Sequence, residues 1–293
     1  MVTTTMAYGQ NVNAPQVGTM AAASVPLPPG VNDAMLAPFK RLEFDPQVQS
    51  RGLFTRFNNS IFKPQGDPPF PAVVVAHSCG GVTSNLRERA IELLDAGYLI
   101  IVPDSFGPRG QRDCRNGVIR NPVAWRDFMD AAAQLRKLPE VDANRVFLVG
   151  FSMGSIAASA LSGPTQRSAA GGSTPFRAVV GWYGSCGATS PQAGGRPLRF
   201  LLADVDTPLL LLMAQGDRET PIRPYCFPLL DELKAAGKPV QWHIYPPPTT
   251  HAWDYPLGYS LTLTSGETIY NRYDRQATVD AMRRTLEFLR QFN

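Results

Sequence analysis

Long apolar runs, dense charge and histidine are all scarce in this sequence of 293 residues. The longest uninterrupted apolar run spans residues 209–214, far short of the about 18 residues that a membrane-spanning helix needs. The 28 lysines and arginines against 24 aspartates and glutamates leave a net charge of only +4, without a dense basic block. We therefore expect neither a membrane span nor a nucleic-acid partner. Only three histidines and four cysteines are present, so chemistry that depends on either residue type has few candidates.

The first part of the chain differs in composition from the rest. Residues 1–32 contain no charged side chain and are rich in proline, threonine and alanine, which predicts an extended, flexible leader over residues 1–35. This segment lacks the basic start and the apolar stretch of a signal peptide. Either the protein is cytoplasmic, or the chain begins after a removed signal. Residues 36–293 are expected to form a single domain, and the apolar content of 44% suits a globular fold.

From residue 38 onward, short apolar runs alternate with helical patterns. Alternation of this kind predicts an α/β fold in which a mostly parallel sheet is covered by helices on both faces. The weaker alternation of residues 41–60 suggests antiparallel strands at one edge of the sheet. Asn85 and Glu88 have the spacing of a capping box, which predicts a helix from Leu86. Buried strands are predicted at residues 70–76, 98–102, 145–149, 178–182, 209–214 and 240–245, and helices at 86–97, 121–135, 153–161, 227–236 and 275–291.

A candidate nucleophile lies between the predicted strand 145–149 and the helix that follows it. The stretch Gly150-Phe-Ser152-Met-Gly154 has the Gly-x-Ser-x-Gly pattern of a nucleophile elbow. In such an elbow, the flanking glycines let neighbouring backbone pass closely, and the serine hydroxyl projects above the sheet. The alternative is that Ser152 only caps the helix. The strand–turn–helix setting favours the nucleophile.

Ser152 needs a general base, and each of the three histidines has a distinct place. His243 lies inside the predicted strand 240–245 and is interpreted as structural. His77 ends a strand before a glycine-rich turn, where a hydrogen bond from its ring would support the loop. His251 lies in the loop after the last predicted strand, where α/β-hydrolases carry their base. His251 is therefore the predicted base.

The carboxylate that orients the histidine should follow an earlier strand. Asp217 comes directly after the strand 209–214, whereas Asp204 and Asp206 precede that strand and fall at the wrong end of the sheet. Glu219 is the fallback. The chain order Ser152, Asp217, His251 is the order of the α/β-hydrolase triad.

Acyl transfer at Ser152 also needs two backbone N–H groups directed at the oxyanion. The predicted donors are Met153, which follows the nucleophile, and Cys79, in the turn after the strand 70–76. Phe106, Arg109, Trp182 and Tyr183 follow neighbouring strands and are predicted to line a substrate cleft. For the aromatic residues, plain packing is the alternative. Arg109 could bind an anionic substrate group or hold its own loop through backbone carbonyls.

From about Pro71 to the C-terminus, the sequence resembles the dienelactone hydrolase family of α/β-hydrolases. The stretches that carry the resemblance are VVVAHSCGG, PDSFGPRG, VFLVGFSMGS, GDRETP, THAWD and YDRQATVDAMRRTLEFL. It implies a cofactor-free ester or lactone hydrolase with Ser152, Asp217 and His251 as the triad. Two positions depart from the family pattern: the best-known members have a cysteine nucleophile, as against Ser152, and many relatives have glycine where this chain has Ser78.

All four cysteines are expected in adjacent loops at the edge of the sheet that carries Ser152. We predict disulfides between Cys186 and Cys226 and between Cys79 and Cys114; the alternatives are other pairings or four reduced thiols. No C-x-x-C spacing suggests zinc, and no metal site is predicted. If the disulfides form, the protein is expected in the periplasm or outside the cell. Otherwise it is expected in the cytoplasm.

Together these features predict a serine hydrolase that cleaves small-molecule carboxylic esters or lactones through an acyl-enzyme on Ser152. A small peptidase or amidase of the same fold is one alternative. It usually requires an additional domain that gates the substrate, for which this chain has no room. A non-catalytic binding protein on the same scaffold is another, and its expected mark is a broken triad.

Overall fold

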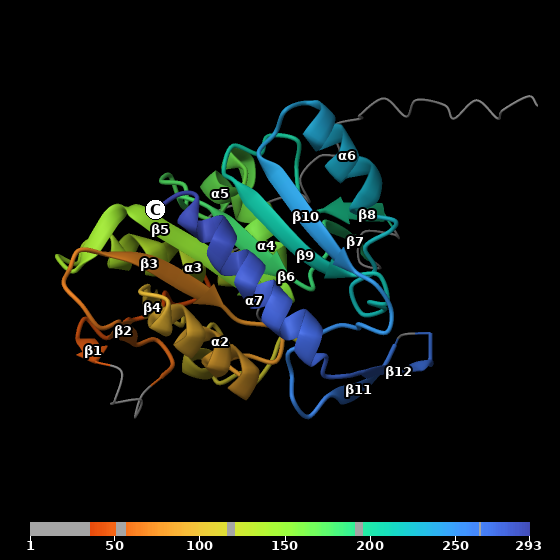
Figure 1. Ribbon diagram of the computed structural model, residues 1–293, viewed down its shortest axis with the longest axis horizontal. Helices are drawn as coiled ribbons and strands as arrows, with labels where there is room; N and C mark the ends of the chain where they lie inside the picture. Colours follow the sequence, from red (N-terminus) through yellow and green to blue (C-terminus); the bar gives the residue numbers. More distant parts are fainter. Residues whose placement is uncertain (1–35, 51–56, 116–120, 191–195, 264) are drawn as a thin grey trace, which may run out of the picture.

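The computed structural model describes residues 36–50, 57–115, 121–190, 196–263 and 265–293. The predicted leader, residues 1–35, lies outside the described residues. Within them the central sheet has eight strands in the order β1-β2-β4-β3-β5-β6-β9-β10 (Figure 1). These strands are β1 (Val48–Ser50), β2 (Ile61–Lys63), β3 (Phe70–Ala76), β4 (Leu99–Ile101), β5 (Val141–Phe151), β6 (Val179–Trp182), β9 (Leu209–Ala214) and β10 (Val240–Tyr245).

The prediction of a mostly parallel sheet is confirmed. Every neighbouring pair from β4 to β10 is parallel. At the other edge β2 runs antiparallel to β4, and β1 runs parallel to β2. The prediction of antiparallel strands over residues 41–60 is met only in part: β1, the described strand within that range, pairs parallel with β2, and the antiparallel strand β2 begins one residue beyond it. The central strands are buried on both faces, which is why they read as continuous apolar runs.

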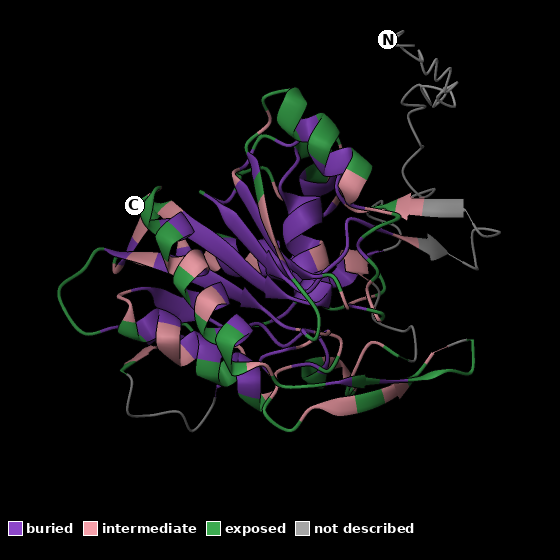
Figure 2. Ribbon diagram, turned by 45° about the vertical axis from the view of Figure 1, so that its right-hand side comes forward, coloured by how far each residue is buried: buried purple, intermediate pink, exposed green. Residues whose placement is uncertain are grey.

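Helices cover both faces of the sheet. α2 (Ser84–Asp95) and α7 (Arg275–Arg290) cross the face turned to the viewer in Figure 1, and α3 (Asn121–Leu135), α4 (Met153–Leu161) and α6 (Phe227–Ala235) pack on the other. Alternate residues of β3 divide between the two layers: Val74 packs with the α3 and α4 side, and Val73 with the α2 and α7 side. The result is two core layers separated by a buried sheet (Figure 2).

The start of α2 differs from the prediction. The helix begins at Ser84 with Thr83 as its N-cap residue, so Asn85 lies inside the first turn and does not cap it. The side chain of Asn85 is buried and donates a hydrogen bond to Asp254 at 3.1 Å. The side-chain oxygen of Asn85, the atom that a cap would need, accepts from the Thr83 hydroxyl at 2.6 Å. The capping-box prediction was wrong because the helix begins one residue before Asn85.

Two antiparallel hairpins that the sequence analysis did not predict lie beside the sheet. One pairs β7 (Gly187–Ser190) with β8 (Arg196–Arg199), and the other pairs β11 (Tyr259–Thr262) with β12 (Thr268–Asn271). The short helices η1 (Gly107–Arg109) and α5 (Pro164–Ala169) complete the described elements. The β11–β12 hairpin matters for function because Tyr259, Ser260 and Leu261 form part of a pocket wall.

Both predicted cysteine pairs are disulfide-bonded. Cys79 joins Cys114 with Cα atoms 5.0 Å apart, and Cys186 joins Cys226 with Cα atoms 5.1 Å apart. The second bond is fully buried, whereas both cysteines of the first are partly exposed. No helix within the described ranges is both long and apolar enough to span a membrane.

Candidate active site

Ser152 occupies a sharp turn between β5 and α4. Its backbone has φ +52° and ψ −107°, which an L-residue rarely adopts. The flanking glycines make the turn possible: a Cβ atom on Gly150 would lie 2.0 Å from the carbonyl oxygen of Gly154, and one on Gly154 would lie 2.1 Å from that of Ala76. The Ser152 N–H donates to the carbonyl of Trp182 at 2.9 Å, which fixes the turn to the end of β6. Residues 150–154 thus have the backbone geometry of a nucleophile elbow.

A continuous line of hydrogen bonds joins the three residues singled out in the sequence. His251 Nε2 lies 2.9 Å from Ser152 Oγ, and His251 Nδ1 lies 2.7 Å from Asp217 Oδ2. All three residues are buried, although Ser152 is also part of a pocket wall. A neutral imidazole in this position would donate from Nδ1 to the carboxylate and accept from the serine hydroxyl at Nε2.

The Asp217 carboxylate is held by its own loop, directly after β9. The backbone N–H groups of Glu219 and Thr220 donate to Oδ1 at 3.0 and 2.7 Å, and the Thr220 hydroxyl donates to Oδ2 at 2.7 Å. The two carboxylates that the sequence analysis set aside are engaged elsewhere. Asp206 pairs with Arg167, and Asp204 accepts from the Thr165 N–H.

Opposing effects act on the imidazole of His251. Burial lowers its pKa, but the carboxylates of Asp217 and then Glu219 raise it, and the net result is a pKa above the ordinary value of 6.5. The carboxylates favour the imidazolium that forms when the ring accepts a proton. The site therefore combines a basic histidine with a serine hydroxyl in hydrogen-bond contact.

The other two histidines have different surroundings. His77 is fully buried; its Nδ1 donates to the Ser78 carbonyl at 2.7 Å, and its Nε2 accepts from the Ser105 N–H at 3.1 Å. Burial lowers its pKa, so the neutral ring is favoured. His243 lies in β10 with its ring against that of Tyr245. Neither histidine lines the pocket that contains Ser152, among the residues that the structure describes.

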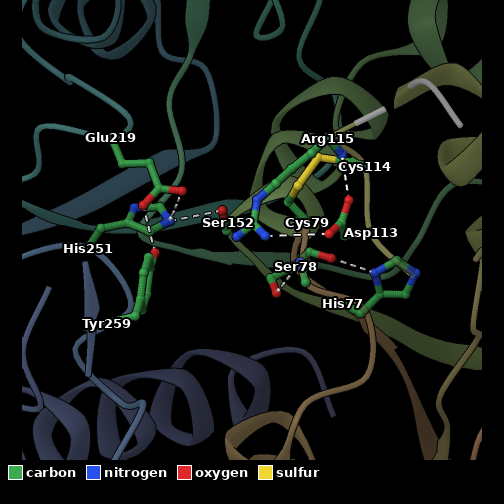
Figure 3. The surroundings of a disulfide bond; sticks show 11 residues. His77, Ser78, Cys79, Asp113, Cys114, Arg115, Ser152, Glu219, His251 and Tyr259 are labelled. Atoms are coloured by element: carbon green, nitrogen blue, oxygen red, sulfur yellow. Dashed lines mark hydrogen bonds and ion pairs between the residues drawn. A yellow bond between two sulfur atoms is a disulfide. The ribbon is translucent and has the colours of Figure 1, made fainter. Parts of the chain in front are cut away.

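The turn after β3 faces Ser152 across that pocket (Figure 3). Ser78, Cys79 and Gly80 form this part of the wall, while Met153 is the first residue of α4. The disulfide ties Cys79 to Cys114, and the Cys114 N–H also donates to the Cys79 carbonyl at 3.1 Å. The turn that contains one predicted oxyanion donor is therefore fixed by His77 on one side and by the disulfide on the other.

The pocket has a volume of about 430 Å³. Its remaining walls include Arg115, Tyr255 and the β11 residues Tyr259 and Leu261. Arg115 follows the disulfide and pairs with Asp113 (Figure 3). This volume lies within the range of small-molecule binding sites. The β11 contribution was missed because that hairpin was not predicted, although the alternation of residues 259–271 around Ser265-Gly266 was a usable signal.

Of the four residues predicted to line the cleft, the structure brings only Tyr183 to the pocket. Tyr183 has φ +43°, packs its ring edge-on against His251 and donates its hydroxyl to Asp254 at 2.8 Å. Ala252, beside His251, has φ +46°. Three of the described non-glycine residues with positive φ, namely Ser152, Tyr183 and Ala252, thus surround the same pocket.

The structure places Phe106 and Trp182 outside the pocket, which corrects the prediction for these two side chains. Phe106 is buried against the ring of His77, with centroids 4.7 Å apart. Trp182 is buried on the α7 side of the sheet, where its indole N–H donates to Thr285 at 2.9 Å. Trp182 follows the alternation of β6 into the core, and Phe106 is buried in the loop between β4 and η1; both correspond to the packing alternative.

Arg109 also lies outside the described pocket wall. Its guanidinium makes two hydrogen bonds to the buried carboxylate of Asp127, at 2.7 and 2.9 Å, and donates to the carbonyls of Ser105 and Lys40 at 2.8 and 2.6 Å. Arg109 therefore holds its own loop, which was the alternative, and the prediction that it lines the substrate cleft is corrected. Among the described residues, no group of three or more His, Cys, Asp or Glu side chains is arranged to hold a metal.

Comparisons with known proteins identify the family and agree with the fold. Residues 57–293 match the profile of the dienelactone hydrolase family. A putative dienelactone hydrolase from Klebsiella pneumoniae has a similar fold, with a TM-score of 0.54 and 22% identity over 78% of this chain and 90% of that one. An esterase from Thermogutta terrifontis has a TM-score of 0.54 and 15% identity over 79% and 88% of the chains. An α/β-hydrolase from a deep-sea metagenome has a TM-score of 0.53 and 18% identity over 75% and 85%. No curated protein sequence matches the chain.

The family match covers most of the chain, and the chain therefore belongs to the dienelactone hydrolase family and is a carboxylic-ester hydrolase.

Proposed function

We propose that this hydrolase cleaves carboxylic esters or lactones through an acyl-enzyme on Ser152, with His251 as general base and Asp217 as its orienting carboxylate. The observation that carries the proposal is the unbroken line from Asp217 Oδ2 through both nitrogens of His251 to Ser152 Oγ, with distances of 2.7 and 2.9 Å. A binding protein on this scaffold would not need that line, and its presence favours the enzyme.

In the first half of the reaction, His251 Nε2 removes the hydroxyl proton of Ser152 as Oγ attacks the carbonyl carbon of the substrate. The oxyanion that forms accepts hydrogen bonds from the N–H groups of Met153 and Cys79. The N-terminus of α4 lies beside it and favours negative charge there. The imidazolium then protonates the leaving alkoxide, and the acyl group remains on Ser152.

Treatment with a fluorophosphonate probe, followed by mass spectrometry, tests the nucleophile. We expect one added mass on Ser152, hydrolysis of a short-chain chromogenic ester, and loss of both in Ser152→Ala. Ser168→Ala, at an exposed position on α5, is the control and should behave as wild type. A folded Ser152→Ala variant that keeps wild-type activity would refute the proposal.

The two disulfides also support a proposal about location. We propose that the protein works in the periplasm or outside the cell, because disulfides persist in oxidising compartments. Thiol titration of the unfolded, unreduced protein isolated from its native source tests this proposal. We expect no reactive thiol, and four reactive thiols would contradict it.

A further inference from the structure

Glu219, the fallback to Asp217 as the acid, lies near the other ring nitrogen of His251. Asp217 contacts Nδ1 of His251, whereas Glu219 Oε1 lies 4.0 Å from Nε2, the nitrogen that also faces Ser152 Oγ. Glu219 is part of the pocket wall, and its side chain is 25% exposed. Figure 3 shows its carboxylate beside the imidazole. A second carboxylate thus adjoins the nitrogen where protons are exchanged.

The orientation of this carboxylate is set by the β11–β12 hairpin. The Tyr259 hydroxyl donates to Glu219 Oε2 at 2.6 Å, and the Asn271 amide donates to the same oxygen at 3.1 Å. Tyr259 and Asn271 are directly opposite each other in the antiparallel pair, so one rigid cross-strand pair supplies both donors. Because both bind Oε2, the other oxygen, Oε1, is left directed at His251.

A separation of 4.0 Å is too long for a hydrogen bond but suits two atoms that share one water molecule. With hydrogen bonds of about 2.8 Å each, two atoms that bind a common water lie about 4–5 Å apart. We propose that Glu219 is a catalytic residue for deacylation, and that it holds the attacking water between its Oε1 and His251 Nε2. This inference rests on the proposed acyl-enzyme at Ser152.

The deacylation step balances without a change in the protonation state of Glu219. The water oxygen attacks the acyl carbon while one of its protons moves to His251 Nε2 and the other remains hydrogen-bonded to Glu219 Oε1. The tetrahedral intermediate collapses, the bond between the acyl carbon and Ser152 Oγ breaks, and Oγ recovers the proton from Nε2. The carboxylic acid product leaves. Glu219 acts only as an acceptor that fixes the direction of the water lone pair.

Glu219→Gln is a sharp test because of how the side chain is held. Tyr259 and Asn271 both donate, so they retain the amide oxygen and leave the NH₂ group facing His251. That group cannot accept a hydrogen bond from water. Rapid-mixing measurements with a chromogenic ester separate acylation, seen as a burst of released alcohol, from steady-state turnover. We expect turnover to fall about tenfold to hundredfold while the burst rate constant stays within about threefold.

Intact-mass spectrometry of the same reaction should show acyl-enzyme accumulating in Glu219→Gln. Tyr259→Phe, which keeps the carboxylate but removes one of its supports, should shift the ratio of the two rates in the same direction and by less. Glu232→Gln removes the same charge from an exposed position on α6 and should leave both rates unchanged. An equal fall of burst and turnover in Glu219→Gln would show that Glu219 acts only on the general electrostatics of His251 and would overturn the proposal. If wild type gave neither a burst nor a fluorophosphonate adduct, the failure would lie in the proposed function.

Discussion

The disulfide between Cys79 and Cys114 should contribute to activity as well as to stability, and the second disulfide provides a matched control. The two bonds close loops of nearly equal length, with sequence separations of 35 and 40 residues. The entropy lost by the unfolded chain depends on the logarithm of loop length, so each bond should stabilise the fold by about 4 kcal/mol. The double variants Cys79→Ser/Cys114→Ser and Cys186→Ser/Cys226→Ser should therefore lose similar stability, corresponding to a fall in Tm of roughly 10 °C.

Activity should separate the two variants. Cys79 lies in the pocket wall and is one of the two proposed oxyanion donors, and the bond to Cys114 fixes its turn. An oxyanion donor is worth about 10²–10³ in rate. A donor that is loosened but still present should cost less, so we expect kcat to fall about tenfold in Cys79→Ser/Cys114→Ser. Cys186 and Cys226 are fully buried and do not line the described pocket, so their variant should keep kcat within about twofold below its Tm.

The assay is kcat for a short-chain chromogenic ester at 20 °C or another temperature at which both variants are folded by circular dichroism, together with Tm from thermal unfolding. Mild reduction of the native protein offers a second route, because the Cys79–Cys114 bond is partly exposed and the other is buried. It should reproduce the loss in kcat. Equal kcat values in the two variants would refute the idea that this disulfide positions the oxyanion turn.

Two further predictions follow from the charges in the structure. The pKa of His251 is raised, and only the neutral ring can act as the proposed base. With an ester that does not ionise, kcat/KM should therefore fall with decreasing pH through a pKa above 6.5. A fall in kcat/KM centred below pH 6.5 would contradict this. Arg109→Met leaves the buried Asp127 carboxylate without its counter-charge and should lower the free energy of unfolding by about 3–5 kcal/mol. Denaturant titration measures that loss. The kcat of the folded variant should stay near the wild-type value because Arg109 does not line the described pocket. A large fall in kcat without a loss of stability would instead indicate a direct role of Arg109 in substrate binding.

The parts of the fold that sequence patterns predicted are those governed by local chemistry. A strand buried on both faces must be apolar throughout, and β9 reads that way. The turn at residues 150–154 is recognisable from its two glycines: a Cβ atom on Gly150 would collide with the backbone of Gly154, and one on Gly154 would collide with the backbone of Ala76 in β3. The loops that hold Asp217 and His251 follow from the positions of the strands before them. For these features, the residue types and their order along the chain are enough to predict the structure.

The features that were missed depend on partners distant in the chain. Asn85 has cap-like neighbours, but its side-chain NH₂ group donates to Asp254, 169 residues away. Trp182 and Tyr183 are adjacent and both are buried in the same core layer, yet only Tyr183 also lines the pocket. The orientation of Glu219 depends on Tyr259, 40 residues later. Contacts of this kind are decided by tertiary packing, and neither spacing nor periodicity records them.

The left-handed backbone at Ser152, Tyr183 and Ala252 has a consequence for how this protein can change. Each such residue costs about 1 kcal/mol or more relative to a relaxed conformation, and all three costs fall on one pocket. Selection for heat resistance alone would gain stability by relaxing these positions. The residues relaxed would be the proposed nucleophile and the neighbours of its proposed base. Thermal robustness and turnover are therefore opposed at this pocket, and variants that improve both should carry their changes elsewhere in the fold.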